Sequence, residues 1–245
     1  DLISLPVVLA ALLGTITWTL CIFYLALLVS ETHGLIGALV GAATAVAGIK
    51  VILWSGLTKV LIAIILSPLL GFLAGALLMK IIYYLFHSAP ARKAALLFKN
   101  LQIVSSAFMA FSHGRNDAQK PMGILAMVLA LYFGWEEITV PLWVILSVGL
   151  VAGLGVAYGG WRIIKTLGMK IAPLVPEQGF AAEISAASVL QLASVFGIPV
   201  STTHTITSSI VGSGAARRFS SVRWGIVLDI ILSWVLTLPI TIALG

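Results

Sequence analysis

The chain has 245 residues, of which 60% are hydrophobic and only 9% are charged, with 14 Lys and Arg against 8 Asp and Glu. A soluble domain carries about 25% charged residues, so this composition excludes an ordinary soluble enzyme and a disordered chain. The net charge of +6 does not indicate a nucleic-acid partner, because the basic residues stand in short clusters between apolar runs. We therefore expect an all-α integral membrane protein, a polytopic transmembrane helical bundle of about seven or eight passes.

The chain contains eight apolar stretches that are candidate helices. They run at 5–29, 33–53, 59–86, 100–134, 138–160, 181–199, 203–216 and 224–244. Glycines within 138–160, among them Gly149, Gly153 and Gly155, are interpreted as helix-packing positions, since small residues let membrane helices approach closely. The single cysteine, Cys21, excludes a disulfide framework.

The basic residues predict the orientation in the membrane. Nine of the 14 lie in three segments, 87–99, 161–180 and 215–223. Counting passes between these segments places all three on one side, and membrane proteins keep Lys and Arg in cytoplasmic loops. We expect these three segments to face the cytoplasm, and we expect the protein to lie in the plasma (inner) membrane.

A sequence element occurs twice. Residues 30–41 read SETHGLIGALVG and residues 201–212 read STTHTITSSIVG, at an offset of 171, and IILS follows each copy in a later span. Three spans separate the two copies, so the copies face opposite ways across the membrane. Inverted-topology repeats are typical of secondary transporters.

The second copy predicts a helix that starts inside the membrane. Gly197 and Pro199 interrupt the chain, and the following apolar segment is short for a full crossing. Ser201 or Thr202 would cap the new helix, whose free N–H groups suit an anion. A plain turn between two full spans is the alternative, and the sequence leaves both open.

The segment 112–123, SHGRNDAQKPMG, places ionisable residues between two apolar flanks. Charged groups at mid-membrane are costly and are usually functional. We expect Gly114 and Pro121 to interrupt the helix here, giving a discontinuous helix. The alternative is a simple loop between two short spans.

The residue types in this segment suggest cotransport of a cation and an anion. Asn116 and Asp117 offer hard oxygen ligands for a small cation such as sodium, and Arg115 and Lys120 offer positive charge to an oxyanion. Internal pairing of Arg115 and Lys120 with Asp117 or Glu31 is the alternative. Three further hydroxyls could donate to phosphate oxygens: Ser201, Thr202 and Thr203.

Three histidines, His33, His113 and His204, are interpreted as orienting residues that hydrogen-bond within the fold. The HExxH motif and paired cysteines are both absent from the sequence, so a zinc site is not expected. We expect no cofactor apart from the coupling ion, which would be sodium or a proton.

These motifs resemble those of PiT-type inorganic phosphate transporters. HGRNDAQK at 113–120 is similar to the family signature HGxNDxQK, and GIPVSTTH at 197–204 is similar to its second element. The resemblance implies a secondary transporter of orthophosphate, coupled to sodium or protons, with two inverted repeats and phosphate bound between them.

The resemblance also implies roles for individual residues. Asn116 and Asp117 would be cation ligands, with Glu31 as a further candidate. Residues implied to line the phosphate or cation site are Gln119, Ser201, Thr202, Thr203, Ser30 and Thr32. Glu31 stands where the common pattern has Thr, so a proton-coupling role stays open.

The first repeat's GxND element has no match in the chain, so we expect it to lie upstream of Asp1. The expected division is a partial first repeat at 1–86, a cytoplasmic linker at 87–99 and a second repeat at 100–245. The oligomeric state stays open, with a homodimer as one candidate assembly in the lipid membrane.

The predicted function is phosphate symport by alternating access. We do not expect the protein to be an enzyme. A sulfate permease of the same fold is the alternative. An intramembrane hydrolase is disfavoured because Ser201 and His204 have no positioned acid and no Gly-x-Ser-x-Gly element beside them.

Overall fold

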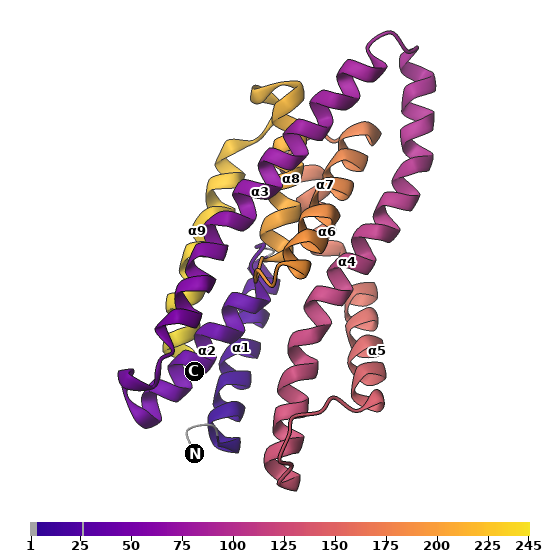
Figure 1. The fold of residues 1–245 in the computed structure, drawn as a ribbon. Coiled ribbons are helices and arrows are strands. Elements are labelled where there is room, and N and C mark those ends of the chain that lie inside the picture. The colour runs from indigo at the N-terminus through magenta and orange to yellow at the C-terminus, as the bar shows by residue number, and fades with distance from the viewer. Residues whose placement is uncertain (1–3, 26) are drawn as a thin grey trace. The chain divides into compact units, whose positions relative to one another are not determined.

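The computed structural model describes residues 4–25 and 27–245, which form helices and connecting turns without a strand. Each of the eight apolar stretches corresponds to a helix, and a short α6 is additional (Figure 1). The helices are α1 (Leu5–Leu25), α2 (Glu31–Ala47), α3 (Trp54–Phe86), α4 (Ala91–Phe133), α5 (Leu142–Gly159), α6 (Trp161–Lys165), α7 (Pro176–Val195), α8 (Thr202–Arg217) and α9 (Trp224–Leu244).

Five of the described helices, α1, α3, α4, α5 and α9, are long and apolar enough to cross a membrane, fewer than the predicted seven or eight. α2 and α8 have 17 and 16 residues. At a rise of 1.5 Å per residue they reach only about 24–26 Å, short of the roughly 30 Å hydrocarbon core. Their lengths favour the re-entrant interpretation of these segments.

The predicted break in the helix at 112–121 is wrong, because α4 runs through both Gly114 and Pro121 as a single helix of 43 residues. Pro121 lacks an N–H, so the carbonyl of Asp117, four residues earlier, loses its regular helical donor. Membrane helices tolerate such a proline because other groups can satisfy the freed carbonyl. The polar cluster therefore lies on a continuous helix.

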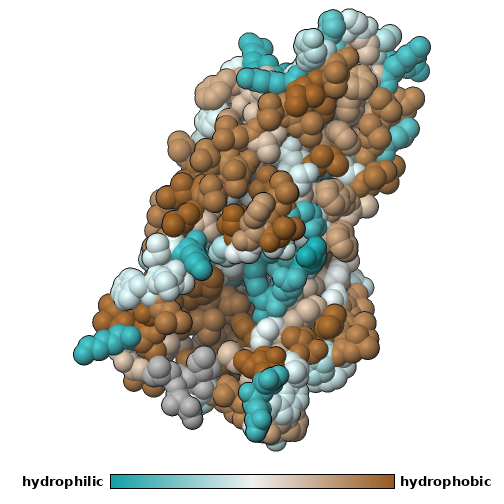
Figure 2. All heavy atoms as spheres, viewed as in Figure 1, coloured by the Kyte–Doolittle hydropathy of each residue, from teal (hydrophilic) through white to brown (hydrophobic). Residues whose placement is uncertain are grey.

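Large apolar side chains cover much of the exterior, as a lipid-facing surface requires (Figure 2). On α3 the exposed residues recur every fourth position, so each lies next to the previous one on a stripe that winds slowly around the helix. They are Leu61, Ile65, Leu69, Leu73 and Leu77.

The chain divides into two compact units that interleave along the sequence. Unit 1 comprises 1–58, 114–162 and 230–245, and unit 2 comprises 59–113 and 163–229. Both the partial first repeat and the second repeat contribute to each unit. The division into repeats at 86 and 100 stays a prediction, and residues 91–99 of the expected linker form the first turns of α4.

Unit 1 is built on the antiparallel α1–α2 hairpin, whose core includes Val7, Ala11, Ala38 and Ala42. The opposite face of α2 packs on α9 through glycines. A Cβ on Gly37 or Gly41 would overlap atoms of α9, so the two backbones approach closely there.

Unit 2 repeats this arrangement with other helices. The α7–α8 hairpin, drawn in orange in Figure 1, has a core that includes Ala186, Leu190 and Val200. α8 packs on α3 at another glycine contact, where a Cβ on Gly212 would overlap the carbonyl oxygen of Phe72. Ser185 on α7 also donates to the Ala74 carbonyl of α3 at 3.1 Å.

The third helix of each repeat is thus exchanged. α3 follows α2 in the sequence but packs on α8, whereas α9 follows α8 but packs on α2. The prediction that the glycines of 138–160 are helix-packing positions is wrong within the described part of the chain. A Cβ on Gly149, Gly153 or Gly155 would meet no described atom within 4 Å, because α5 is exposed along most of its length.

Candidate functional site

The repeated SxTH elements form two similar helix starts. Ser30 caps α2 and accepts a hydrogen bond from the His33 N–H at 3.4 Å, and Ser201 caps α8 and accepts from the His204 N–H at 3.3 Å. Both serines and both histidine rings are at most 2% exposed. The predicted N-cap at Ser201 is confirmed, and each first turn keeps further N–H groups that could contact an anion.

Each helix start is anchored by the exchanged helix of its unit. In unit 2, the Ser201 N–H donates at 3.0 Å to the hydroxyl of Ser67 on α3. In unit 1, the indole Nε1 of Trp234 on α9 donates at 2.8 Å to the carbonyl of Leu28, just before Ser30. Ser67 and Trp234 were not predicted as site residues, although Ser67 ends one IILS copy and Trp234 follows the other.

The polar cluster of α4 divides between two faces of the helix. At about 100° per residue, His113, Asn116, Asp117 and Lys120 share one face. Arg115 lies about 200° from Asp117, and Gln119 lies beside Arg115, since they are four positions apart. Helical geometry therefore places Arg115 and Gln119 on a different face of α4 from Asp117, and both of these side chains are exposed.

Two groups on the Asp117 face differ in their partners. The Lys120 ammonium lies 2.8 Å from an Asp117 carboxylate oxygen, so the alternative of internal pairing is observed for Lys120. The Asn116 amide nitrogen is buried and has no hydrogen-bond partner among the residues that the structure describes. A buried donor without a partner is costly, so the Asn116 amide N–H is a candidate contact for a hydrogen-bond acceptor.

Glu31, at the start of α2, lies close to this cluster within unit 1. Thr19 on α1 donates a hydrogen bond of 2.7 Å to its carboxylate. Glu31 is also within electrostatic range of Asp117 and Lys120. Thr19 was not predicted as a site residue, although the run TITWT places three threonines in an otherwise apolar helix.

The remaining predicted residues separate by unit. Unit 1 holds Ser30, Thr32 and His33, with His33 in electrostatic range of Lys120. Unit 2 holds Ser201 and its neighbours Thr202, Thr203 and His204. Thr32 and Thr202 are buried, at 9% and 3% exposed.

Comparison with known proteins shows the family to which the chain belongs. Residues 1–245 match the model of a family described as "Phosphate transporter family". The chain belongs to the phosphate transporter family. The family predicted from the two motifs is confirmed, and the chain is a membrane transporter rather than an enzyme.

Relatives support this assignment. The chain is 45% identical over 240 residues to a probable low-affinity inorganic phosphate transporter of Rhizobium meliloti, covering 97% of this chain and 72% of the relative. It is 41% identical to a protein of the same description from Bacillus subtilis, covering 98% and 72%.

A solved structure has the same fold. The structure titled "The sodium-dependent phosphate transporter" matches with a TM-score of 0.86 and 25% identity, covering 97% of this chain and 77% of that one. The helical membrane fold predicted from composition and repeats is therefore confirmed for this phosphate transporter family member.

Proposed function

We propose that this member of the phosphate transporter family moves inorganic phosphate across the plasma membrane by sodium-coupled symport and alternating access. The observation that carries the proposal is the group of charges in unit 1, where Glu31 and Asp117 both lie near the ammonium of Lys120. A matching solved structure is titled a sodium-dependent phosphate transporter, which supports the choice of ion.

The charges of this group favour a bound cation. When ionised, Glu31 and Asp117 together exceed the charge of Lys120 by one negative unit, and a sodium ion would restore neutrality. Hard cations prefer carboxylate, carbonyl and amide oxygens. Asn116 offers an amide oxygen and Asp117 a carboxylate.

Phosphate would bind at donors of a capped helix start. Backbone N–H groups at a helix N-terminus attract anions. In unit 1 the hydroxyl of Thr32 lies in the first turn of α2. The start of α8 in unit 2 offers Thr202 and Thr203 in the same positions. Without a cation, Glu31 would repel a phosphate at the start of α2. We therefore infer that the cation binds before phosphate.

A proton is the alternative coupling ion, because protonation of Glu31 would also remove one negative charge. The two ions can be separated by reconstituting the full-length protein in liposomes and imposing sodium and proton gradients independently. Sodium coupling predicts uptake of labelled phosphate with a sodium gradient at equal pH. Uptake driven only by the pH gradient would assign the proton instead.

Asp117→Asn tests the site itself. The substitution preserves shape but removes the charge that faces Lys120 and the cation, so we expect sodium-driven phosphate uptake to fall by at least about tenfold, since a charged hydrogen bond contributes about 1.5–3 kcal/mol. Glu137→Gln, in the α4–α5 loop, is the matched control and should transport normally. Unchanged uptake by Asp117→Asn would show that Asp117 has no part in the mechanism. In the unchanged protein, stronger competition by sulfate than by unlabelled phosphate would contradict the assignment of phosphate as the substrate.

A further inference from the structure

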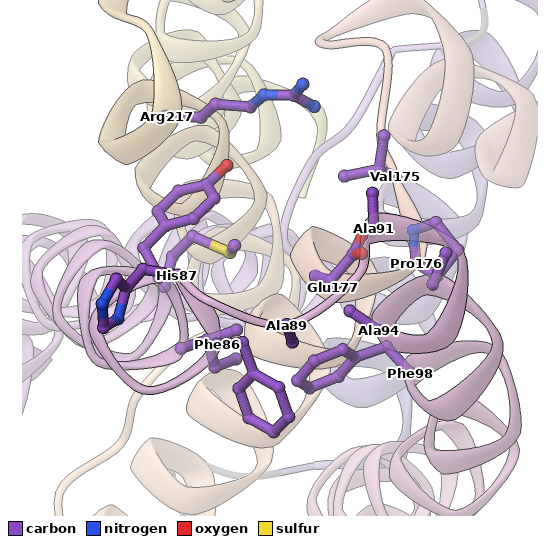
Figure 3. A pocket seen from close by; sticks show the side chains of 14 residues that line it. Phe86, His87, Ala89, Ala91, Ala94, Phe98, Val175, Pro176, Glu177 and Arg217 are labelled. Carbon is purple, nitrogen blue, oxygen red and sulfur yellow. The ribbon is translucent and has the colours of Figure 1, made fainter.

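A pocket of about 400 Å³ lies in unit 2, at the end of α8 that is opposite to its capped start. It opens where α3 ends and α4 begins, beside the first turn of α7 and the last turn of α8 (Figure 3). α3 and α4 are both long enough to cross the membrane, so we place their junction at 87–90, and with it the pocket, at the ends of these two spans on one side of the membrane.

One wall of the pocket is apolar and aromatic. Phe86 and Phe98 meet edge to face with ring centroids 5.0 Å apart. Phe98 is buried in the core with Met79 and Ile82, whereas Phe86 stays partly exposed. Ala94 also lines the pocket and leaves space where a larger side chain would fill it (Figure 3). This wall suits a hydrocarbon chain.

The pocket also carries two opposite charges. Arg217 comes from the C-terminal end of α8 and Glu177 from the first turn of α7. Neither makes an ion pair or a hydrogen bond within the described part of the chain. Both act electrostatically on Tyr83, which lines the same pocket, so both charges lie near its hydroxyl.

We propose that this pocket binds a glycerophospholipid with a zwitterionic aminophosphate headgroup, of the phosphatidylethanolamine class. The lipid phosphate would pair with the Arg217 guanidinium, whose planar donors suit phosphate oxygens. The lipid ammonium would pair with Glu177, and an acyl chain would lie against the partly exposed Phe86 and Ala94. Pockets with basic residues between transmembrane helices at this depth are suited to lipid headgroups.

Other phosphate-bearing ligands fit less well. Inorganic phosphate would leave the aromatic wall unused and would be repelled by Glu177. An anionic lipid such as phosphatidylglycerol would pair with Arg217 but would leave the Glu177 carboxylate without a partner. The zwitterionic lipid is the occupant that satisfies both charges and the apolar wall.

The proposal can be tested by native mass spectrometry of the full-length protein in detergent, titrated with short-chain phosphatidylethanolamine. Arg217→Gln should weaken binding at least tenfold, and Ala94→Phe should do so by filling the pocket without changing its charge. Arg218→Gln is the matched control, because Arg218 is exposed, follows Arg217 in the chain and does not line the pocket. The affinity of this variant for phosphatidylethanolamine should stay within twofold of that of the unchanged protein.

The choice of lipid has its own test. Glu177→Gln should weaken phosphatidylethanolamine binding and leave phosphatidylglycerol binding unchanged or stronger. Equal effects of Arg217→Gln and Arg218→Gln would overturn the pocket as the site. Displacement of the lipid by inorganic phosphate at equal concentration, or tighter binding of phosphatidylglycerol by the unchanged protein, would overturn the proposed ligand.

Discussion

Ser30 and Ser201 show how one residue can prepare a helix start for a ligand. Each hydroxyl satisfies the third N–H of its helix, and substitution of such a cap costs about 1 kcal/mol. The Ser201 hydroxyl remains fixed because the backbone N–H of Ser201 is bound to Ser67 and its carbonyl accepts from Thr205 at 2.8 Å. The N–H groups of the first turn are thus held in place, as the proposed anion site requires.

The two faces of α4 give a prediction for its two basic residues. Lys120 pairs with Asp117 at 2.8 Å, whereas Arg115 lies on the opposite face. Lys120→Gln should therefore lower phosphate uptake by about tenfold or more, since it leaves the Asp117 and Glu31 charges uncompensated. Arg115→Gln, the matched control in the same motif, should change uptake by less than about threefold. Uptake assays in liposomes check both, and a larger loss with Arg115→Gln would contradict the assignment of faces.

At the scale of elements, the packing of unit 2 depends on contacts between backbones. Gly71 and Gly75 on α3 face the carbonyls of Thr205 and Ser209 on α8, and Gly212 on α8 faces Phe72. Without side chains in between, these helices gain dispersion contacts that lipid cannot replace. Membrane helices associate through such packing rather than through the hydrophobic effect.

Gly212→Ala tests this packing. The added methyl would overlap the Phe72 backbone, which cannot rotate away, so we expect a loss of about 1–3 kcal/mol. For a protein of this size that corresponds to a fall in apparent Tm of about 2–4 °C per kcal/mol. Gly153→Ala, with no described atom within 4 Å of its Cβ, should leave the Tm unchanged. Thermal unfolding in detergent compares the two, and equal shifts would refute the contact.

The sequence was sufficient to predict some elements for clear physical reasons. Hydropathy located the helices, since apolar length is what the bilayer requires, and Ser201 was recognisable as a cap from its hydroxyl after Pro199. The continuity of α4 was not predictable from Pro121 alone, because a freed carbonyl can be satisfied by neighbours. The packing glycines were assigned to α5 instead of α3 and α8, since a glycine's partner depends on tertiary contacts that the local sequence does not contain.

At the scale of the whole molecule, the three basic segments meet at one end of unit 2. The Arg223 guanidinium donates at 3.2 Å to the Lys170 carbonyl, joining 161–180 to 215–223. Arg217 and the start of α4 line one pocket, which brings 87–99 to the same end. This clustering supports the proposal that all three segments face the cytoplasm.

Labelling of introduced cysteines checks this orientation. In a variant with Cys21→Ser and any other native cysteine replaced, we expect Ser88→Cys to react with a membrane-impermeant maleimide only after cells are permeabilised. Glu137→Cys, in the loop at the other end of α4, should react in intact cells. The reverse pattern would invert the assignment.

The exchange of α3 and α9 also has a consequence for biogenesis. Trp234 contacts a residue 206 positions earlier, so unit 1 cannot be completed until α9 has left the ribosome. At about 5–20 residues per second, translation of that interval takes roughly 10–40 s. During this time the glycine face of α2 lacks its partner, so a translocon or chaperone that shelters the α1–α2 hairpin would determine how much of the newly made protein matures.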